Sequence, residues 1–279
     1  MVLIALVRLA RPHNGLITAA SVAVGALTAG ALSWSAAGWA ALAAALVGGA
    51  GNAFNDLCDI EIDRVNRPAR PLPAGLVGRR AAAVWTLALA AAGIGCAYWA
   101  APSLGIFAAG VTALLALYSL ALKRTALAGN LAVALAAAAA FPFGALSNGH
   151  LGRSWIPAGF AFLYHLGREL VKDIEDLEGD ARLGARTAPV CWGTAPTAIL
   201  AAAVFALLAA LTWAPPLLGL YGWPYAVPVL LVNAHLLAAV LFLRRHHRAL
   251  PPGALSRRLL LGMLIGLAAV VAGELLPPP

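Results

Sequence analysis

Charged residues are scarce in this chain. Asp, Glu, Lys and Arg make up 11% of its 279 residues, whereas about a quarter is usual in soluble domains. Hydrophobic residues make up 62%, and the mean hydropathy is +0.86. These values exclude an ordinary water-soluble globular protein and indicate a membrane protein. The net charge is +8, but the basic residues alternate with apolar segments instead of forming one basic face, so we expect no nucleic-acid partner.

Cysteine is also rare. The chain has three, Cys58, Cys96 and Cys191, with no CxxC or Cys/His spacing. An odd number without such spacing supports neither a disulfide framework nor a zinc site. We therefore interpret the cysteines as small apolar residues.

Long apolar segments account for most of the chain, and a helix that spans a bilayer needs about 20 mostly apolar residues. Segments of that kind predict nine spans, at 14–34, 36–57, 80–100, 102–122, 125–146, 154–172, 195–215, 224–243 and 257–276. The sequence thus predicts an all-α membrane protein with a single domain over residues 1–279. We expect its helices to surround a central polar cavity that opens to the cytoplasmic side.

The positions of the basic residues test the predicted spans, because cytoplasmic loops of membrane proteins are enriched in Lys and Arg. If the N-terminus lies inside and the C-terminus outside, every Lys and Arg except Arg153 falls on the cytoplasmic side. We therefore predict a multi-pass plasma-membrane protein, in contact with membrane lipids, whose active site faces the cytoplasm. The oligomeric state is left open.

Acidic residues are rarer than basic ones and are unevenly placed. There are 11, and all except Glu274 lie in two segments, 56–63 and 169–180, at the predicted cytoplasmic ends of spans. The spacing i, i+3, i+7 occurs twice within them, as Asp56, Asp59 and Asp63 and as Asp173, Asp176 and Asp180. At about 100° per helical residue, each trio lies on one helix face.

Two readings of the acids compete. Solvated helix ends that pair with nearby arginines would explain one cluster. Two clusters favour a functional site, because an acid within a span costs roughly 2.5–3.5 kcal/mol and such groups usually serve a site. Like charges facing one another repel unless cations lie between them, and oxygen-only ligands suit Mg²⁺. Mg²⁺ usually takes some of its ligands from substrate phosphate, which suggests a diphosphate substrate. Because the surrounding residues are apolar, we expect that substrate to be a lipid diphosphate, whose diphosphate can act as a leaving group.

At this point the chain resembles the UbiA superfamily of intramembrane prenyltransferases. The resemblance rests on NDxxDxxxD from Asn55 to Asp63, RPxRPLPxG from Arg67 to Gly75, and DxxDxxGD from Asp173 to Asp180. Two further pieces are similar to the family, RPHN at 11–14 and YSLALKRTALAGN at 118–130. With nine expected spans, the resemblance covers nearly the whole chain.

The resemblance implies a Mg²⁺-dependent prenyltransferase that takes a prenyl diphosphate donor and a lipid-like acceptor. It implies one metal site at Asn55, Asp56, Asp59 and Asp63 and a second at Asp173, Asp176 and Asp180, with the six aspartates catalytic. The candidates for the diphosphate oxygens are Arg67, Arg70, Lys123 and Lys172. The candidates beside the prenyl chain or its cation are Tyr118, Asn14 and Asn130. Lys172 has two equally weighted roles, contact with phosphate or relief of repulsion among the acids.

Within the superfamily, the segment 167–190 is most similar to the branch that makes digeranylgeranylglyceryl phosphate by ether formation. Chlorophyll synthases share the EGD element and are the nearest alternative, and an aromatic-acceptor branch is more distant. Two other classes remain open. A cation-coupled transporter would place its acids nearer the midplane, and a phosphatidyltransferase would require a DGxxAR segment that the chain lacks.

Overall fold

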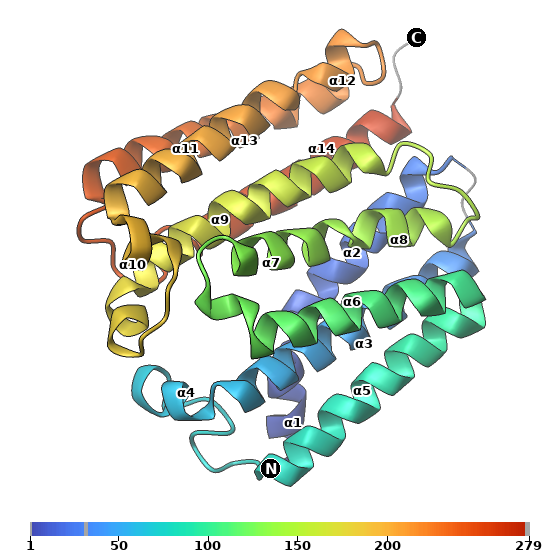
Figure 1. Cartoon of the computed structure of the whole chain (residues 1–279). Coiled ribbons are helices and arrows are strands. Elements are labelled where there is room, and N and C mark those ends of the chain that lie inside the picture. Colours follow the sequence, from blue (N-terminus) through green and yellow to red (C-terminus); the bar gives the residue numbers. More distant parts are fainter. Residues whose placement is uncertain (1, 31–32, 277–279) are drawn as a thin grey trace. The chain divides into compact units, whose positions relative to one another are not determined.

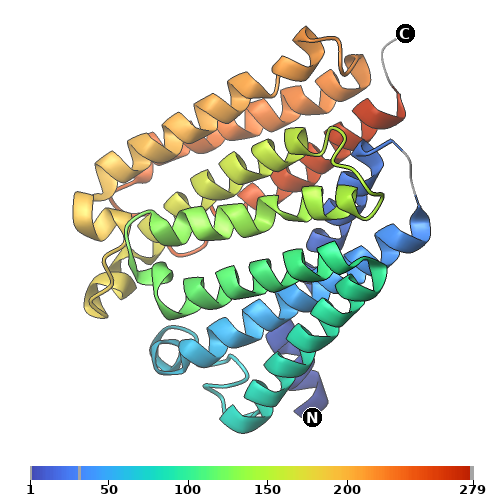
Figure 2. The ribbon, with the colours of Figure 1, turned by 45° about the vertical axis from the view of Figure 1, so that its right-hand side comes forward.

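The computed structural model describes residues 2–30 and 33–276. Over these residues the regular structure is helical, apart from one isolated bridge between Thr125 and Arg186. The chain divides into two compact units, Met1–Leu122 with Ala139–Ser154, and Lys123–Ala138 with Trp155–Pro279. The units interleave in the sequence, and the single domain over 1–279 stays a prediction. The elements of each unit can be followed by colour in two views (Figures 1 and 2).

Unit 1 is a bundle in which the long helix α3 packs against α2, α5 and α6. Its helices are α1 (Val2–Ala10), α2 (Pro12–Thr28), α3 (Trp34–Cys58), α4 (Ile60–Asn66), α5 (Arg79–Ala100), α6 (Pro102–Leu120) and α8 (Ala140–Leu146). Helices α2 and α8 cross at two glycines: a Cβ on Gly25 would lie 2.0 Å from the Phe141 carbonyl oxygen, and one on Gly144 would lie 1.9 Å from that of Val22. Small residues allow this backbone approach, as at other helix contacts in membranes.

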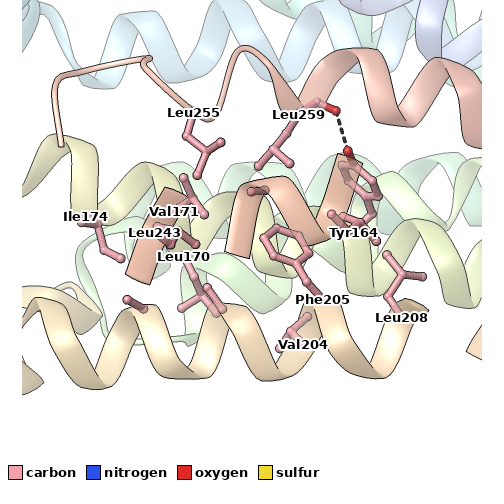
Figure 3. Packing of buried hydrophobic residues seen from close by; sticks show 14 of the residues in the cluster. Tyr164, Leu170, Val171, Ile174, Val204, Phe205, Leu208, Leu243, Leu255 and Leu259 are labelled. Carbon is pink, nitrogen blue, oxygen red and sulfur yellow. Dashed lines mark hydrogen bonds between the residues drawn. The ribbon is translucent and has the colours of Figure 1, made fainter. Parts of the chain in front are cut away.

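Unit 2 has its own hydrophobic core, formed mainly by α9, α11, α13 and α14 (Figure 3). Its helices are α7 (Ala128–Ala138), α9 (Trp155–Arg182), α10 (Ala188–Trp192), α11 (Thr194–Leu211), α12 (Ala214–Leu217), α13 (Trp223–His246) and α14 (Leu259–Leu275). Phe205 of α11 packs where α9 has Gly167, since a Cβ there would lie 2.4 Å from the ring. The Tyr164 hydroxyl donates to the Leu259 carbonyl oxygen at 2.7 Å and fixes α9 against α14.

Six helical segments are long and apolar enough to cross a membrane. They are Trp34–Cys58, Arg79–Ala100, Pro102–Leu120, Ala128–Leu146, Thr194–Leu217 and Trp223–His246. Helix α14 is apolar but shorter, α2 has 17 residues, and α9 carries charged residues from Arg168 onward. The protein is therefore an all-helical, multi-pass membrane protein, whereas the count of nine spans stays a prediction.

Candidate active site

The first acid set lies where α3 ends. Asp56 is on the last turn of α3, Asp59 separates α3 from α4, and Asp63 is on α4. The three do not share one continuous helix, because Asp59 has φ −102° and ψ 9°. The backbone nevertheless keeps a helix-like course: Asp59 N–H donates to the Asn55 carbonyl oxygen, and Asp63 N–H to that of Asp59. Asp56 and Asp63 are consequently buried, and Asp59 is half-buried.

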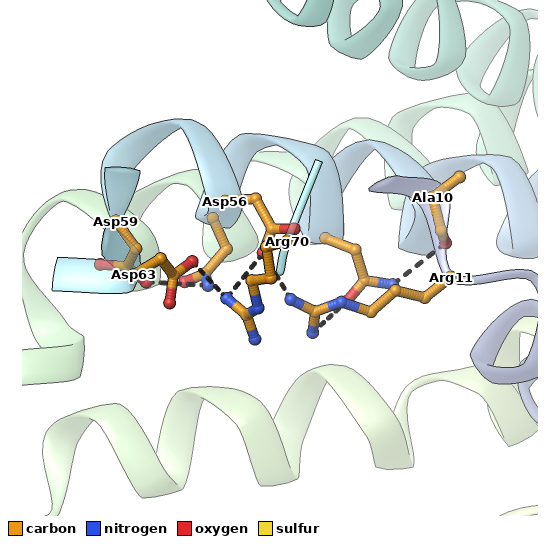
Figure 4. Close-up of polar contacts among 8 residues, drawn as sticks. Ala10, Arg11, Asp56, Asp59, Asp63 and Arg70 are labelled. Carbon is orange, nitrogen blue, oxygen red and sulfur yellow. Dashed lines mark hydrogen bonds and ion pairs between the residues drawn. The ribbon is translucent and has the colours of Figure 1, made fainter. Parts of the chain in front are cut away.

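Two arginines from distant segments converge on these carboxylates (Figure 4). Arg70 Nη1 lies 2.5 Å from Asp63 Oδ2 and 3.1 Å from Asp56 Oδ1. Arg11 Nη2 lies 2.5 Å from the same Asp56 oxygen. Two buried carboxylates without such partners would be costly, so the arginines compensate the negative charge of the set.

Asparagines complete the hydrogen bonding around the first acid set. Asn55 Nδ2 donates to Asp59 Oδ2 at 3.0 Å. Asn52 Oδ1 accepts from Arg11 at 3.4 Å, and its amide nitrogen donates to the Ala10 carbonyl oxygen at 3.3 Å. These contacts join α3 to the junction between α1 and α2.

Arg11 has an unusual backbone at that junction. Its φ is 51° and its ψ is 71°, a left-handed conformation that costs a non-glycine residue about 1–2 kcal/mol, and Pro12 follows it. A residue before proline ordinarily favours extended angles. Contacts with Asp56 and Asn52 hold this strained residue at the acid set, and strain of this kind concentrates at functional sites.

Residues 67–78 form a non-helical segment that brings Arg70 to the acids. Leu72 and Val77 are buried in a cluster with Leu9 of α1 and Ile60 of α4. Gly75 supplies a turn with φ 70°, a value that glycine adopts without steric cost. The segment is therefore anchored by packing.

Burial affects the protonation of Asp63, the last residue of the first acid set. The pKa of Asp63 is raised above its usual value because burial disfavours the charged carboxylate, and the neighbouring Arg70 opposes this shift without cancelling it. A carboxylate in this position gains from a cation ligand.

The second acid set lies on one continuous helix, α9, which runs ten residues past the predicted end of the span at residue 172. Asp173, Asp176 and Asp180 are all half-buried. Asn130, near the start of α7, donates to Asp173 Oδ2 at 2.8 Å. Thr187, just before α10, donates its hydroxyl to Asp180 Oδ2 at 2.9 Å.

The turn after α9 fixes Thr187 and the segment that carries Lys123. Gly184 has φ 68° and reverses the chain. Arg186 N–H then donates to the Arg124 carbonyl oxygen at 2.8 Å, and Arg186 forms a bridge with Thr125. Lys123 is thereby held in the same unit as the second acid set.

Lys172 pairs with Glu169, one turn before Asp173. The distance from its ammonium nitrogen to Glu169 Oε2 is 3.2 Å, and Arg168 Nη1 lies 2.9 Å from Glu169 Oε1. Glu169 is buried. This pairing positions Lys172 beside the aspartates but leaves both of its predicted roles open.

The donor chemistry of both sets fits Mg²⁺. Each set offers carboxylate and amide or hydroxyl groups without Cys or His. Over residues 2–30 and 33–276, no three His, Cys, Asp or Glu side chains converge as a preformed metal cage. That result is compatible with Mg²⁺, which binds one or two carboxylates and takes its other ligands from water and phosphate.

The remaining predicted residues are more dispersed. Tyr118 is near the end of α6 and Asn14 is in the first turn of α2, both half-buried, and Arg67 is exposed. In the described part of the chain, neither Asn14 nor Arg67 has a side-chain hydrogen bond with either acid set. Their roles stay predictions.

Sequence reasoning missed two contributors. Arg11 lies in the RPHN segment that resembles the family, but it was not assigned to the site, although it contacts Asp56. Thr187 had no sequence signal, since the partner of a hydroxyl group depends on tertiary contacts.

The sequence matches the UbiA prenyltransferase family over residues 16–261. The chain belongs to this family. Membership makes it a prenyltransferase and removes the transporter and phosphatidyltransferase readings.

Relatives in the family align with most or nearly all of this chain. The chain is 43% identical to digeranylgeranylglyceryl phosphate synthase of Methanopyrus kandleri over 97% of this chain and 99% of that one. It is 36% identical to the synthase of the same name from Pyrococcus abyssi, over 84% and 85% of the two chains.

Solved structures share the UbiA fold. One, described as digeranylgeranylglyceryl phosphate synthase in membranes, has a TM-score of 0.76 and 26% identity over 98% of both chains. A UbiA homologue from Archaeoglobus fulgidus bound to GPP and Mg²⁺ has a TM-score of 0.76 at 22% identity, over 96% of this chain and 98% of that one. An apo homologue from Aeropyrum pernix reaches 0.79 at 20% identity, over 94% and 97%.

Proposed function

We propose that this chain transfers a geranylgeranyl group from its diphosphate to the free hydroxyl of geranylgeranylglyceryl phosphate. The carbon–oxygen bond to diphosphate breaks, an ether bond to the acceptor oxygen forms, and the hydroxyl proton is released. The products are digeranylgeranylglyceryl phosphate, a precursor of ether lipids, and diphosphate.

The observation that carries this proposal is the 43% identity with a digeranylgeranylglyceryl phosphate synthase across both whole chains. Other relatives with that name agree. The motif DIEDLEGD from Asp173 to Asp180 supports the same branch.

The two acid sets would each hold Mg²⁺. Asn55, Asp56, Asp59 and Asp63 form the first set, and Asp173, Asp176 and Asp180 form the second. Bound Mg²⁺ supplies positive charge that stabilises a departing diphosphate. The Mg²⁺ in the complex of the Archaeoglobus fulgidus homologue supports this cofactor.

Neighbouring residues position the carboxylates of each set to bind Mg²⁺. Arg70 and Arg11 form ion pairs with Asp56, and Asn130 and Thr187 orient one oxygen each of Asp173 and Asp180. We assign Arg67, Arg70, Lys123 and Lys172 to the diphosphate oxygens, since cationic donors bind phosphate well. Tyr118, Asn14 and Asn130 are assigned to the prenyl chain or its cation, which an aromatic face stabilises.

The proposed topology follows the basic residues. We infer nine spans, a cytoplasmic N-terminus and an external C-terminus in the plasma membrane, with a polar cavity that opens to the cytoplasm. The six helical segments that are long and apolar enough to cross a membrane support this arrangement, as does the bias of Lys and Arg.

The reaction is tested with purified protein, Mg²⁺ and labelled geranylgeranyl diphosphate, offered separately with geranylgeranylglyceryl phosphate, chlorophyllide and 4-hydroxybenzoate. We expect labelled ether product with the glyceryl phosphate alone, and no product after EDTA is added. Product with a tetrapyrrole or aromatic acceptor would keep the family chemistry but overturn the proposed acceptor.

A further inference from the structure

Five arginines gather where α13 ends and α14 begins. Arg244 and Arg245 lie in the last turn of α13, Arg248 follows it, and Arg257 and Arg258 immediately precede α14. All five are exposed, and α13 packs against α14. We call these five residues the arginine surface.

The arginine surface has no ion-pair partner in the described part of the chain. Among residues 2–30 and 33–276, no carboxylate forms an ion pair with any of these five arginines, and the nearby Glu175 accepts hydrogen bonds from the turn instead. The sequence has no Asp or Glu between Asp180 and Glu274. By contrast, the exposed Arg64 and Arg79 both pair with Glu61. The arginine surface therefore carries concentrated, uncompensated positive charge.

The arginines continue two apolar stripes that face outward. On α13, the exposed Leu237 and Leu241 precede Arg244 and Arg245 at i, i+4, i+7 and i+8, which places all four on one helix face. On the other side of the turn, Arg257 leads into the exposed Leu261 and Leu264 at i+4 and i+7.

Exposed leucines on a helix that is long enough to cross a membrane contact lipid chains. Side chains that extend the same stripe beyond the end of that helix lie at the level of the lipid headgroups. This places Arg244 and Arg245 at headgroup depth.

The turn that carries the arginines is held in one conformation from within unit 2. The buried Glu175 on α9 accepts from the backbone N–H groups of Gly253, Leu255 and Ser256 and from the Ser256 hydroxyl, at 2.5–3.0 Å. Arg168 Nε donates to the Ser256 carbonyl oxygen at 3.1 Å. The turn is thus attached to the helix that bears the second acid set.

Aromatic stacking also orders part of the surface. The Arg258 guanidinium carbon lies 5.7 Å from the centroid of the Phe242 ring, and Phe242 stacks on His246 at 4.3 Å. Fixed cationic side chains lose less conformational entropy when they bind an anion than freely moving ones do.

We propose that the arginine surface binds the phosphate headgroups of anionic membrane lipids. The partner is the surrounding bilayer, because the charge adjoins lipid-facing leucines and none of the five arginines forms an ion pair within the described residues. This inference does not depend on the identity of the acceptor substrate.

The test uses the purified full chain in a neutral detergent, titrated with fluorescent phosphatidylglycerol or phosphatidylcholine. The variant Arg244→Gln/Arg245→Gln is compared with Arg64→Gln/Arg79→Gln, which removes two exposed arginines that do have a carboxylate partner. A third variant, Arg244→Lys/Arg245→Lys, keeps the charge. Thermal unfolding in the same detergent establishes that each variant is folded.

We expect the wild type to prefer phosphatidylglycerol, and the first variant to bind it about tenfold more weakly. The Glu61-paired variant should bind as the wild type does, and the lysine variant should retain most of the affinity. The preference should weaken at high salt, because exposed charges are screened.

Three results would overturn the proposal. Equal affinity for the two lipids would show that the arginines serve membrane topology alone. Equal losses in the two glutamine variants would show a general charge effect. Competition by inorganic phosphate at the same concentration as the lipid would show a site for free anions instead of a lipid surface.

Discussion

Asn130 Nδ2 lies 2.8 Å from Asp173 Oδ2 and joins the start of α7 to the middle of α9 across 43 sequence positions. The donor occupies one carboxylate oxygen and leaves the other for a different ligand. Partners of this kind orient metal ligands, and their loss typically costs 10–100-fold in metal affinity or activity.

Replacement of Asn130 by alanine should therefore weaken Mg²⁺ activation. We expect the Mg²⁺ concentration for half-maximal prenyl transfer to rise about 10–100-fold in Asn130→Ala. Thr197→Val serves as the control, because Thr197 is also buried in unit 2 but donates to the Gly193 carbonyl oxygen, away from the acids. A similar rise in both variants would point to a general effect on unit 2.

The aspartates themselves should be indispensable. Asp59→Asn and Asp176→Asn should each reduce turnover by at least about 100-fold, since each substitution removes a negative charge from a site that binds Mg²⁺ mainly through carboxylates. Turnover is measured by transfer of labelled geranylgeranyl under saturating Mg²⁺.

A glutamate close to each acid set in the sequence provides a matched control. Glu61 and Glu178 are exposed and pair with neighbouring arginines, so Glu61→Gln and Glu178→Gln should keep nearly full activity. Full activity in either asparagine variant, with the protein folded, would remove that aspartate from the metal site.

Arg70 compensates the negative charges of Asp56 and Asp63. Its replacement by glutamine should lower the melting temperature by several degrees in EDTA, because breaking a buried ion pair leaves uncompensated charge. Mg²⁺ should restore part of the loss by supplying positive charge to the same carboxylates. Arg67→Gln, at an exposed position, should show neither effect. If Mg²⁺ does not raise the lowered melting temperature of Arg70→Gln, the result would argue against metal binding at these carboxylates.

Glu175 should control the turn before α14. In Glu175→Gln one carboxylate oxygen becomes an NH₂ group, so at least one of the three backbone N–H donors loses its acceptor, whereas the Ser256 hydroxyl can reverse and accept from the NH₂ group. A buried unsatisfied donor costs about 1–3 kcal/mol.

Hydrogen exchange provides the measurement. The amides of Gly253, Leu255 and Ser256 should exchange at least about fivefold faster in Glu175→Gln, which corresponds to about 1 kcal/mol. Glu178→Gln, three residues along α9, should leave them unchanged. Unaltered protection in Glu175→Gln would mean that packing alone holds the turn.

The sequence by itself determined the class of the protein. Long apolar segments can bury their backbone groups in lipid only as helices, so an all-helical membrane protein follows from composition and length. The two aspartate trios indicated a functional site, because acidic residues are energetically costly in such a chain and usually serve a function. Together with the RPxRPLPxG segment, they pointed to the family.

Local patterns also had limits. The i, i+3, i+7 spacing predicted a continuous helix face for both trios, and this holds for α9 but not at Asp59, where α3 ends and α4 begins. A spacing pattern describes positions on an ideal helix and contains no information on where the helix is interrupted.

The tertiary structure alone decided the partners of the acids. Arg11 reaches Asp56 across 45 positions, Asn130 reaches Asp173 across 43, and Glu175 binds a turn about 80 residues away. Each pairing depends on how helices pack, and helix packing is set by contacts such as Gly167 against Phe205 that no single segment encodes. The sequence therefore supplied the charged groups, and the fold decided which of them compensate one another.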